Sequence, residues 1–210
     1  MGVTGLIGVG FVIVHMAGNL QVFLGAAKIN NYGALLHGPL AELTWLVRAV
    51  LIIAVILHIL MAYQLARRSA AARPIDYQQR EPQVATLASR TMTWGGILLL
   101  AFIIVHILHF TTESVDPAGW RGMTDAHGER DVYGNVVASF RIWWVAAFYI
   151  ISMLALGFHL YHGAWSSVRT LGYAKSSSHP LRRHIALSIA VVVWLGFTII
   201  PLSVIAGILR

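Results

Sequence analysis

Long apolar stretches dominate the chain and alternate with short polar segments. Five stretches reach the length of about 20 residues that a helix needs to cross a bilayer, and they cover residues 3–25, 42–66, 91–112, 142–168 and 185–209. Each is continuously apolar, whereas a strand of a membrane barrel shows alternating positions over about 10 residues. The pattern therefore predicts an all-α membrane protein in which residues 1–210 form one domain, a bundle of five transmembrane helices.

Charged residues between the spans predict which side of the membrane each segment faces. Two segments, between spans two and three and between spans four and five, carry Arg67, Arg68, Arg73, Arg80, Arg90, Arg169, Lys175, Arg182 and Arg183. The segment 113–141 is mixed, with five acidic residues against three arginines. Because loops rich in lysine and arginine stay in the cytoplasm, we expect the N-terminus to be cytoplasmic and the C-terminus to lie outside.

The composition agrees with a chain that is membrane-embedded almost throughout. It is 58% hydrophobic and 11% charged, whereas soluble domains are about 25% charged. The absence of cysteine excludes disulfides, cysteine-ligated iron–sulfur clusters and thioether-linked haem. The net charge of +7 resides largely beside the spans, so it indicates topology and anionic lipid, and no nucleic-acid partner is expected.

Four histidines lie inside the first four apolar spans, at His15, His58, His106 and His159. An ionisable ring is costly in a bilayer core and therefore marks a functional site. A single buried histidine is best explained by a hydrogen bond between helices. Four of them on four successive spans instead predict a cofactor held between helices, and we expect two haems, each held by two imidazoles.

The depths of these histidines sort them into two pairs. His58 and His159 lie nine and ten residues before a basic residue at the inner edge, so roughly 14 and 15 Å from it at 1.5 Å per residue. His106 lies sixteen residues after Arg90, roughly 24 Å outward, and His15 lies at least about 21 Å outward. Depth therefore predicts an inner haem on His58 and His159 and an outer haem on His15 and His106.

Two of these histidines belong to i, i+3 doublets, His106 with His109 and His159 with His162. Both members of a doublet share a helix face, so spacing alone does not choose the ligand. The second member of each doublet would find a partner in a haem propionate, a quinone or water. Ordinary solvated histidine is the interpretation for the remaining ones, which are His37, His127, His179 and His184. His37 is the exception to follow, because it lies just before span two near the outer pair.

Several polar residues near the span ends are candidates for cofactor contacts. Arg48 is a candidate for a propionate of the outer haem, and Arg90 and Arg169 for those of the inner haem; snorkelling to the headgroups is the alternative. His37 and Glu42 lie near the outer end of span two, where they suggest a quinone site. The inner side, towards a soluble partner, is the second place considered for that site.

Two glycines fall on the same helix faces as outer histidines. Gly95 lies eleven residues before His106 and Gly8 seven before His15, which is nearly in phase at about 100° per residue. Both would leave room for the inner haem. Close helix packing through small residues explains them equally well.

Four short segments give the chain a resemblance to a known family. They are IVHMAGN around His15, ILHILMAY around His58, FIIVHILHF around His106 and FHLYHGAWSS from Phe158 to Ser167. The last is the most specific. Together, in this order and spacing, they resemble the single-chain dihaem cytochrome b anchor of succinate:quinone oxidoreductases, the succinate dehydrogenases and fumarate reductases.

The resemblance covers all five spans and implies a function. It implies that His15 and His106 ligate the outer haem b and His58 and His159 the inner one, in preference to His109 and His162. It implies that a cytoplasmic iron–sulfur subunit, carrying a flavoprotein subunit, docks on a chain in the inner (plasma) membrane of a bacterium. The implied assembly is respiratory complex II, an enzyme of the tricarboxylic acid cycle. Its succinate chemistry would occur on the partner subunits. Electrons would pass to or from a quinone, with menaquinone favoured.

One position departs from the family, and other functions compete. Some members carry a glutamate two residues before the fourth ligand for transmembrane proton transfer, and this chain has Gly157 there. The alternatives are a dihaem anchor of a nitrate reductase, formate dehydrogenase or hydrogenase, a haem-free proton-coupled transporter, and a passive anchor. Only Glu42, at a span end, is acidic within the spans, which disfavours the transporter. Oligomeric state, including a higher oligomer, stays open.

Overall fold

A computed structural model describes residues 1–72, 87–172 and 179–210 of the chain. Five helices in this described part are long and apolar enough to span a membrane. They are α1 (Gly2–Asn19) with the 3₁₀ turn η1 (Leu20–Leu24), α3 (Ala41–Ala71), α5 (Met92–His106) with the π-helical turn η2 (Ile107–Thr111), α7 (Trp143–Thr170) and α8 (His179–Ile205). The predicted all-helical, multi-pass membrane architecture is therefore confirmed, with span ends shifted by a few residues.

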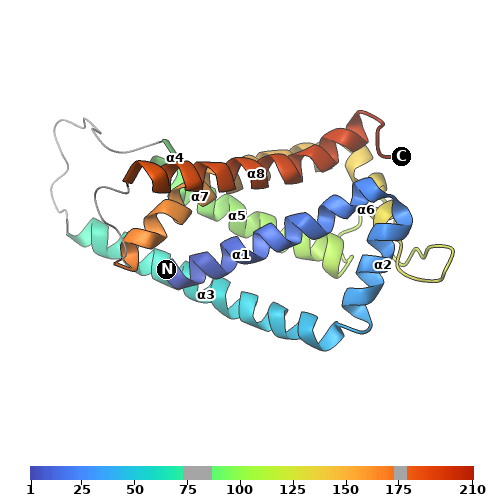
Figure 1. Ribbon diagram of the computed structural model, residues 1–210, viewed down its shortest axis with the longest axis horizontal. Helices are drawn as coiled ribbons and strands as arrows, with labels where there is room; N and C mark the ends of the chain where they lie inside the picture. Colours follow the sequence, from blue (N-terminus) through green and yellow to red (C-terminus); the bar gives the residue numbers. More distant parts are fainter. Residues whose placement is uncertain (73–86, 173–178) are drawn as a thin grey trace.

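Three shorter helices were not expected from the hydropathy pattern: α2 (Ala26–His37), α4 (Leu87–Arg90) and α6 (Val132–Arg141). The side chain of Asp131 starts α6 by accepting a hydrogen bond from the backbone N–H of Gly134 at 2.9 Å, as an N-cap residue does. Helices α2 and α6 lie side by side at one end of the bundle. We call this end the capped end (Figure 1).

The helices pack around α7, which contacts α8, α5 and α1 along the bundle. Figure 1 shows α8 lying along this group and α3 diverging from α1. Of the described helices, only α1 and α2 pack extensively against α3. Most of the α3 surface is therefore left for lipid or for another subunit, as its exposed side chains Leu46, Ile52 and Ile53 indicate.

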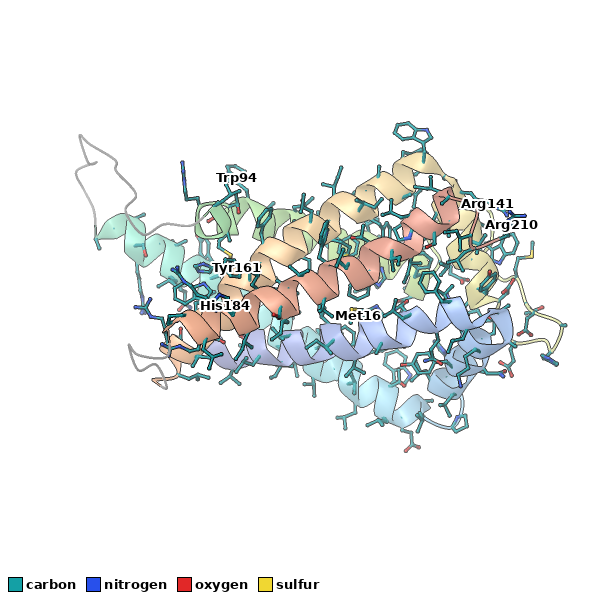
Figure 2. The ribbon with its side chains drawn as sticks, turned by 45° about the horizontal axis from the view of Figure 1, so that its top comes forward. Met16, Trp94, Arg141, Tyr161, His184 and Arg210 are labelled. Carbon is teal, nitrogen blue, oxygen red and sulfur yellow. The ribbon has the colours of Figure 1, made fainter. Side chains whose placement is uncertain are left out.

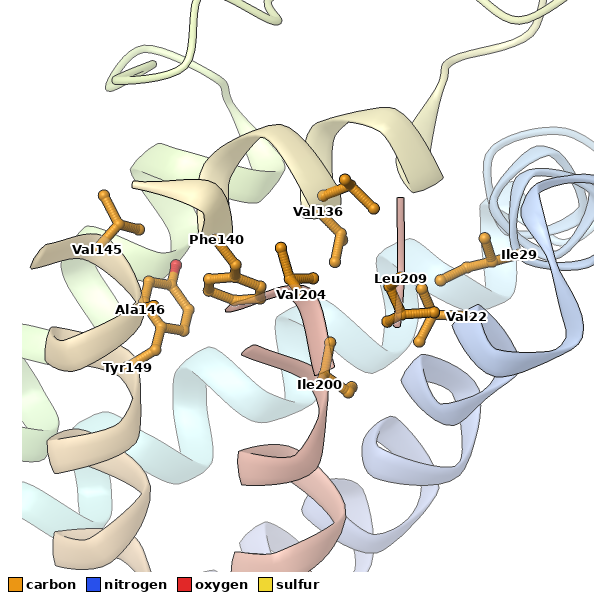
Figure 3. Close-up of a cluster of buried hydrophobic side chains, with 11 residues drawn as sticks. Val22, Ile29, Val136, Phe140, Val145, Ala146, Tyr149, Ile200, Val204 and Leu209 are labelled. Carbon is orange, nitrogen blue, oxygen red and sulfur yellow. The ribbon is translucent and has the colours of Figure 1, made fainter. Parts of the chain in front are cut away.

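Two clusters of buried apolar side chains hold the bundle together. The larger lies at the capped end, where Phe140 of α6 packs edge-to-face on Tyr149 of α7 with ring centroids 5.1 Å apart. Figure 3 shows these two rings beside Ile200 and Val204 of α8. The smaller cluster joins α1, α7 and α8 through Met16, Leu160, Ala190 and Val193.

A clasp centred on Asn30 ties α2 to the loop before α6. Its amide donates to Asp125 at 3.1 Å and to Asp131 at 3.2 Å, and its carbonyl oxygen accepts from the backbone N–H of Tyr133. The backbone N–H of His127, followed by the Asn30 amide, lowers the pKa of the Asp125 carboxyl. Burial raises the pKa of the Asp116 carboxyl. Hydrogen bonds from backbone N–H groups, led by that of Trp120, lower this pKa by more, so the net shift is downward.

Arginines gather at the other end of the bundle, which we call the basic end. Gly2 at the start of α1 lies there against Leu171 at the end of α7. The described basic residues at this end are Arg67, Arg68, Arg90, Arg169, Arg182 and Arg183, and Arg73, Arg80 and Lys175 lie outside the described residues. Figure 2 places Tyr161 and His184 towards this end and Arg141 and Arg210 at the capped end.

A close approach between α1 and α2 makes Gly18 a test of this packing. A Cβ atom at Gly18 would lie 2.8 Å from Tyr32 Cε1, whereas one at Gly10 of the same helix would meet no atom within 4 Å. We predict that Gly18→Ala destabilises the protein by about 1–3 kcal/mol and lowers its melting temperature in detergent. Gly10→Ala is the matched control and should not lower it; equal melting temperatures would contradict the packing described.

Candidate functional site

His15 of α1 and His106 of α5 face each other across the bundle interior. Their ring centroids are 5.9 Å apart and their planes cross at 77°. Aromatic rings surround them: Phe11 stacks on His15 at 5.2 Å, Phe197 lies 5.8 Å from His15, and Phe102 stacks on His106 at 5.5 Å. These neighbours give the pair an apolar enclosure.

His58 of α3 and His159 of α7 form a second pair, with ring centroids 6.1 Å apart and planes at 56°. Gly5 of α1 lies beside this pair, because a Cβ there would be 3.5 Å from His58 Cε1. His15 follows Gly5 by ten residues, so the pairs lie roughly 15 Å apart along α1. We call His15 and His106 the outer pair and His58 and His159 the inner pair, after their predicted sides.

The spacing within each pair suits two imidazoles that share one metal ion. Bonds of about 2.0 Å from ring nitrogen to metal place the centroids of opposed rings roughly 6 Å apart. Within the described residues, no hydrogen bond joins His15 to His106 or His58 to His159. Direct hydrogen bonding between the paired histidines therefore does not explain why they face each other.

The helices that carry each pair do not pack closely on one another. Neither α1 with α5 nor α3 with α7 is among the extensively packed helix pairs of the described chain. Each histidine pair thus joins two helices that are not packed directly on each other. These helices are instead connected by their close contacts with α7 and α1.

The polar neighbours of the inner pair leave one nitrogen available. The hydroxyl of Thr4 donates to the carbonyl of Met1 at 3.0 Å and lies 3.1 Å from His58 Nδ1. Since that hydroxyl hydrogen is used, Thr4 accepts from His58 Nδ1–H, which leaves Nε2 without a proton. His159 Nδ1 is buried without a hydrogen-bond partner among the described residues.

The outer pair has polar neighbours of a different kind. Asn19 lies one turn beyond His15, with its amide nitrogen 3.3 Å from the ring nitrogens and 2.7 Å from the His15 carbonyl. The hydroxyl of Tyr149 lies 3.4 Å from His106 Nδ1. The second nitrogen of each ring therefore has its own environment, which sets its tautomer.

The second members of the doublets take different environments. His109 is 3% exposed and lies between the hydroxyls of Tyr149 and Ser139, each 3.0 Å from one ring nitrogen. His162 has a buried Nδ1 without a partner in the described chain, and its ring lies 5.8 Å from that of Trp165. Of the two, His109 already has protein partners on both nitrogens.

The other candidate residues lie away from the histidine pairs. Arg48 lies over Trp45 at 5.0 Å and Arg169 over Trp165 at 5.5 Å, while Arg90 is exposed at the end of α4. His37 bonds the Gly33 carbonyl of its own helix at 2.9 Å, and Glu42 is exposed in the first turn of α3. In the described part of the chain, no hydrogen bond, ion pair or ring contact joins these five to either pair.

The two glycines singled out by phase lie in open space. A Cβ at Gly8 or Gly95 would meet no atom within 4 Å, so tight helix packing does not account for them. Gly95 lines a cavity of about 80 Å³ together with Phe158 and His159. Because cofactor pockets measure roughly 300–1,000 Å³, this cavity holds only an edge of such a group.

The chemistry of the donors restricts the kind of metal site. Among the described residues, no group of three or more His, Cys, Asp or Glu side chains converges on one point. A metal ion bound in a protein commonly takes four or more ligands, and each histidine pair offers two. Two imidazoles on opposite faces suit a metal whose other ligands come from a flat macrocycle, as in haem.

A comparison of the chain with protein-family models, with curated proteins and with solved structures finds no match. The arrangement of the site therefore carries the functional argument together with the sequence motifs.

The polar partners of the histidines were not expected from the sequence. Asn19 was detectable from its position four residues after His15 on the same helix face. Thr4, Tyr149 and Ser139 come from other helices than the histidines they contact. A single sequence carries no local signal for such contacts between helices.

The open space at Gly95 generates a prediction about cofactor binding. Gly95→Leu would fill the cavity beside His159, so we expect it to lower the amount of cofactor bound at the inner pair while the outer pair keeps its own. Gly96→Leu is the matched control, because Gly96 is equally open but does not line the cavity. Pigment per purified chain measures the effect, and equal loss in both variants would refute it.

Proposed function

We propose that this chain is a dihaem membrane subunit that carries electrons between its two histidine pairs. The observation that supports this most directly is the presence of two facing pairs with centroids 5.9 and 6.1 Å apart. Both bridge helices that are not closely packed, and they lie at two levels of the bundle. In this proposal His15 and His106 hold one haem b, and His58 and His159 hold the other.

A haem held at each pair would supply an iron that accepts and gives up one electron. With His15 and His106 holding one such group and His58 and His159 the other, an imidazole would take each side of the iron and no position would be left for oxygen chemistry. The rings of Phe11, Phe102 and Phe197 exclude water around the outer pair. In this proposal the three rings would keep solvent away from the outer redox centre, and the two pairs lie roughly 15 Å apart along α1, which favours electron transfer as the role.

We further propose that the subunit belongs to a succinate:quinone oxidoreductase of a bacterial inner membrane. This part depends on the motifs around the four histidines, above all FHLYHGAWSS. By the positive-inside rule the basic end faces the cytoplasm, where an iron–sulfur subunit carrying the flavoprotein would dock. A quinone, with menaquinone favoured, would exchange the electrons in the membrane. The alternative within this class is the dihaem anchor of another quinone-linked enzyme.

The pairing predicts the spectra of single variants. His58→Ala or His159→Ala should remove one haem, and His15→Ala or His106→Ala should remove the other, since one imidazole does not hold a six-coordinate site. Reduced-minus-oxidised spectra of the purified protein measure this loss by pair. His127→Ala, in an exposed loop, is the control and should keep both haems. Four variants that each retain both haems would exclude this ligand set.

The assignment to succinate chemistry has its own test. We predict that the chain, gently extracted from its native membrane, copurifies with an iron–sulfur and a flavin-containing subunit and that the assembly reduces a quinone with succinate. Deleting the chain should release both subunits from the membrane. Copurification with a subunit for nitrate, formate or hydrogen instead would overturn this assignment while leaving the dihaem proposal intact.

A further inference from the structure

A continuous chain of hydrogen bonds connects the outer histidine pair to a carboxylate at the capped end. It begins at Glu113 and passes through Asn135, Ser139, His109 and Tyr149 to reach His106. Four residues from η2, α6 and α7 thus join the His106 ring to the Glu113 carboxylate in the loop after η2. We call it the Glu113–His106 chain.

The charge at one end fixes the direction of the first bonds. An ionised carboxylate only accepts hydrogen bonds, so Asn135 Nδ2–H donates to Glu113 at 3.4 Å. The Asn135 carbonyl oxygen then accepts from the Ser139 hydroxyl at 3.1 Å. With its hydrogen used in this way, Ser139 Oγ accepts from the imidazole of His109 at 3.0 Å.

The same direction continues to the outer pair. A neutral His109 that donates from Nε2 carries a bare Nδ1, which accepts from the Tyr149 hydroxyl at 3.0 Å. The Tyr149 oxygen then accepts from His106 Nδ1–H at 3.4 Å. The final result is a His106 ring whose Nε2 has no proton and a free lone pair, which is the form that binds a metal.

The surroundings of the Glu113–His106 chain strengthen its hydrogen bonds. Ser139, Asn135, His109 and Tyr149 are all buried, and hydrogen bonds polarise one another more strongly in a low-dielectric interior. Arg130 forms an ion pair with Glu113 and also donates to the Phe110 carbonyl at 2.8 Å. Glu113 adopts a φ of +52°, a conformation that is unfavourable for a non-glycine residue and is found where surrounding structure enforces it.

Within residues 1–72, 87–172 and 179–210, no comparable chain of hydrogen bonds leads from the inner pair to a carboxylate. His58 meets Thr4, which itself donates to a backbone carbonyl, and His159 Nδ1 has no partner in the described part of the protein. No carboxylate is linked to either inner ring through the hydrogen bonds of the described residues. The two pairs therefore differ in what stands behind their imidazoles.

We propose that the Glu113–His106 chain sets the reduction potential of the outer haem by making His106 a more electron-rich ligand. This inference depends on the proposed function. An acceptor on the far nitrogen raises the basicity of a ligating imidazole, and hydrogen bonding behind a ligand is one of the ways in which a protein adjusts a haem potential. A more basic ligand stabilises the oxidised iron, so the chain lowers the potential of the outer haem. Tyr149 and Glu113 act as positioning residues.

The test measures the midpoint potential of each haem by redox titration of the purified, haem-loaded protein. The outer haem is the one that His106→Ala removes. Tyr149→Phe keeps the aromatic ring and deletes the hydroxyl that contacts His106. It should raise the midpoint potential of the outer haem by about 59 mV, which is a tenfold change in the equilibrium of a one-electron reduction. Glu113→Gln keeps a side chain of the same size and removes its charge. It should raise the outer midpoint as well, by about a threefold change in the reduction equilibrium.

Ser152→Ala is the matched control for Tyr149→Phe, because Ser152 is a buried residue of α7 whose hydroxyl donates to the Phe148 carbonyl of its own helix. Neither midpoint should move in this variant, and the inner haem should keep its potential in all three. An outer midpoint unchanged in both Tyr149→Phe and Glu113→Gln, or an equal shift of both haems, would overturn the inference. If Tyr149→Phe loses the outer haem, Glu113→Gln alone decides. A parent protein without haem would instead overturn the proposed function.

Discussion

The structure depends on satisfying imidazole rings in a bundle that excludes water. An unpaired polar group costs several kcal/mol in such surroundings, so each ring nitrogen needs a partner. In His58 and His106 the protein supplies a hydroxyl to Nδ1, from Thr4 and Tyr149. The other side of each ring faces a second histidine, with ring centroids 5.9 and 6.1 Å apart and no hydrogen bond between the paired rings in the described chain. The ring nitrogen on that side still needs a partner, and a cofactor between the two rings of each pair is the partner that we propose.

The architecture separates structural from functional contacts between helices. Close packing runs through α7, with α8, α5 and α1 around it, and the apolar clusters lie along these contacts. The histidine pairs instead join helices that stand further apart. The spacing of the rings is thus set by packing elsewhere in the bundle, so the rings face each other without needing to touch.

Much of this could be predicted from the sequence, because a membrane makes length and depth informative. The five spans followed from apolar length, and the two pairs followed from counting residues between each histidine and the basic edge. Helices α2 and α6 escaped notice because they are too short to span and because their positions depend on contacts such as that of Asn30 with Asp125 and Asp131. The partners of His109 come from α6 and α7, and nothing in the segment around it indicates them.

The loose attachment of α3 has a thermodynamic consequence. This helix carries His58 yet packs extensively only on α1 and α2 among the described elements. Any group that bridges His58 and His159 would add a link between α3 and α7 that the polypeptide itself hardly provides. By mass action, a ligand that binds only the assembled form stabilises it in proportion to RT ln(1 + [L]/Kd). The position of α3 in the bundle and the occupancy of the inner pair are therefore a single coupled equilibrium.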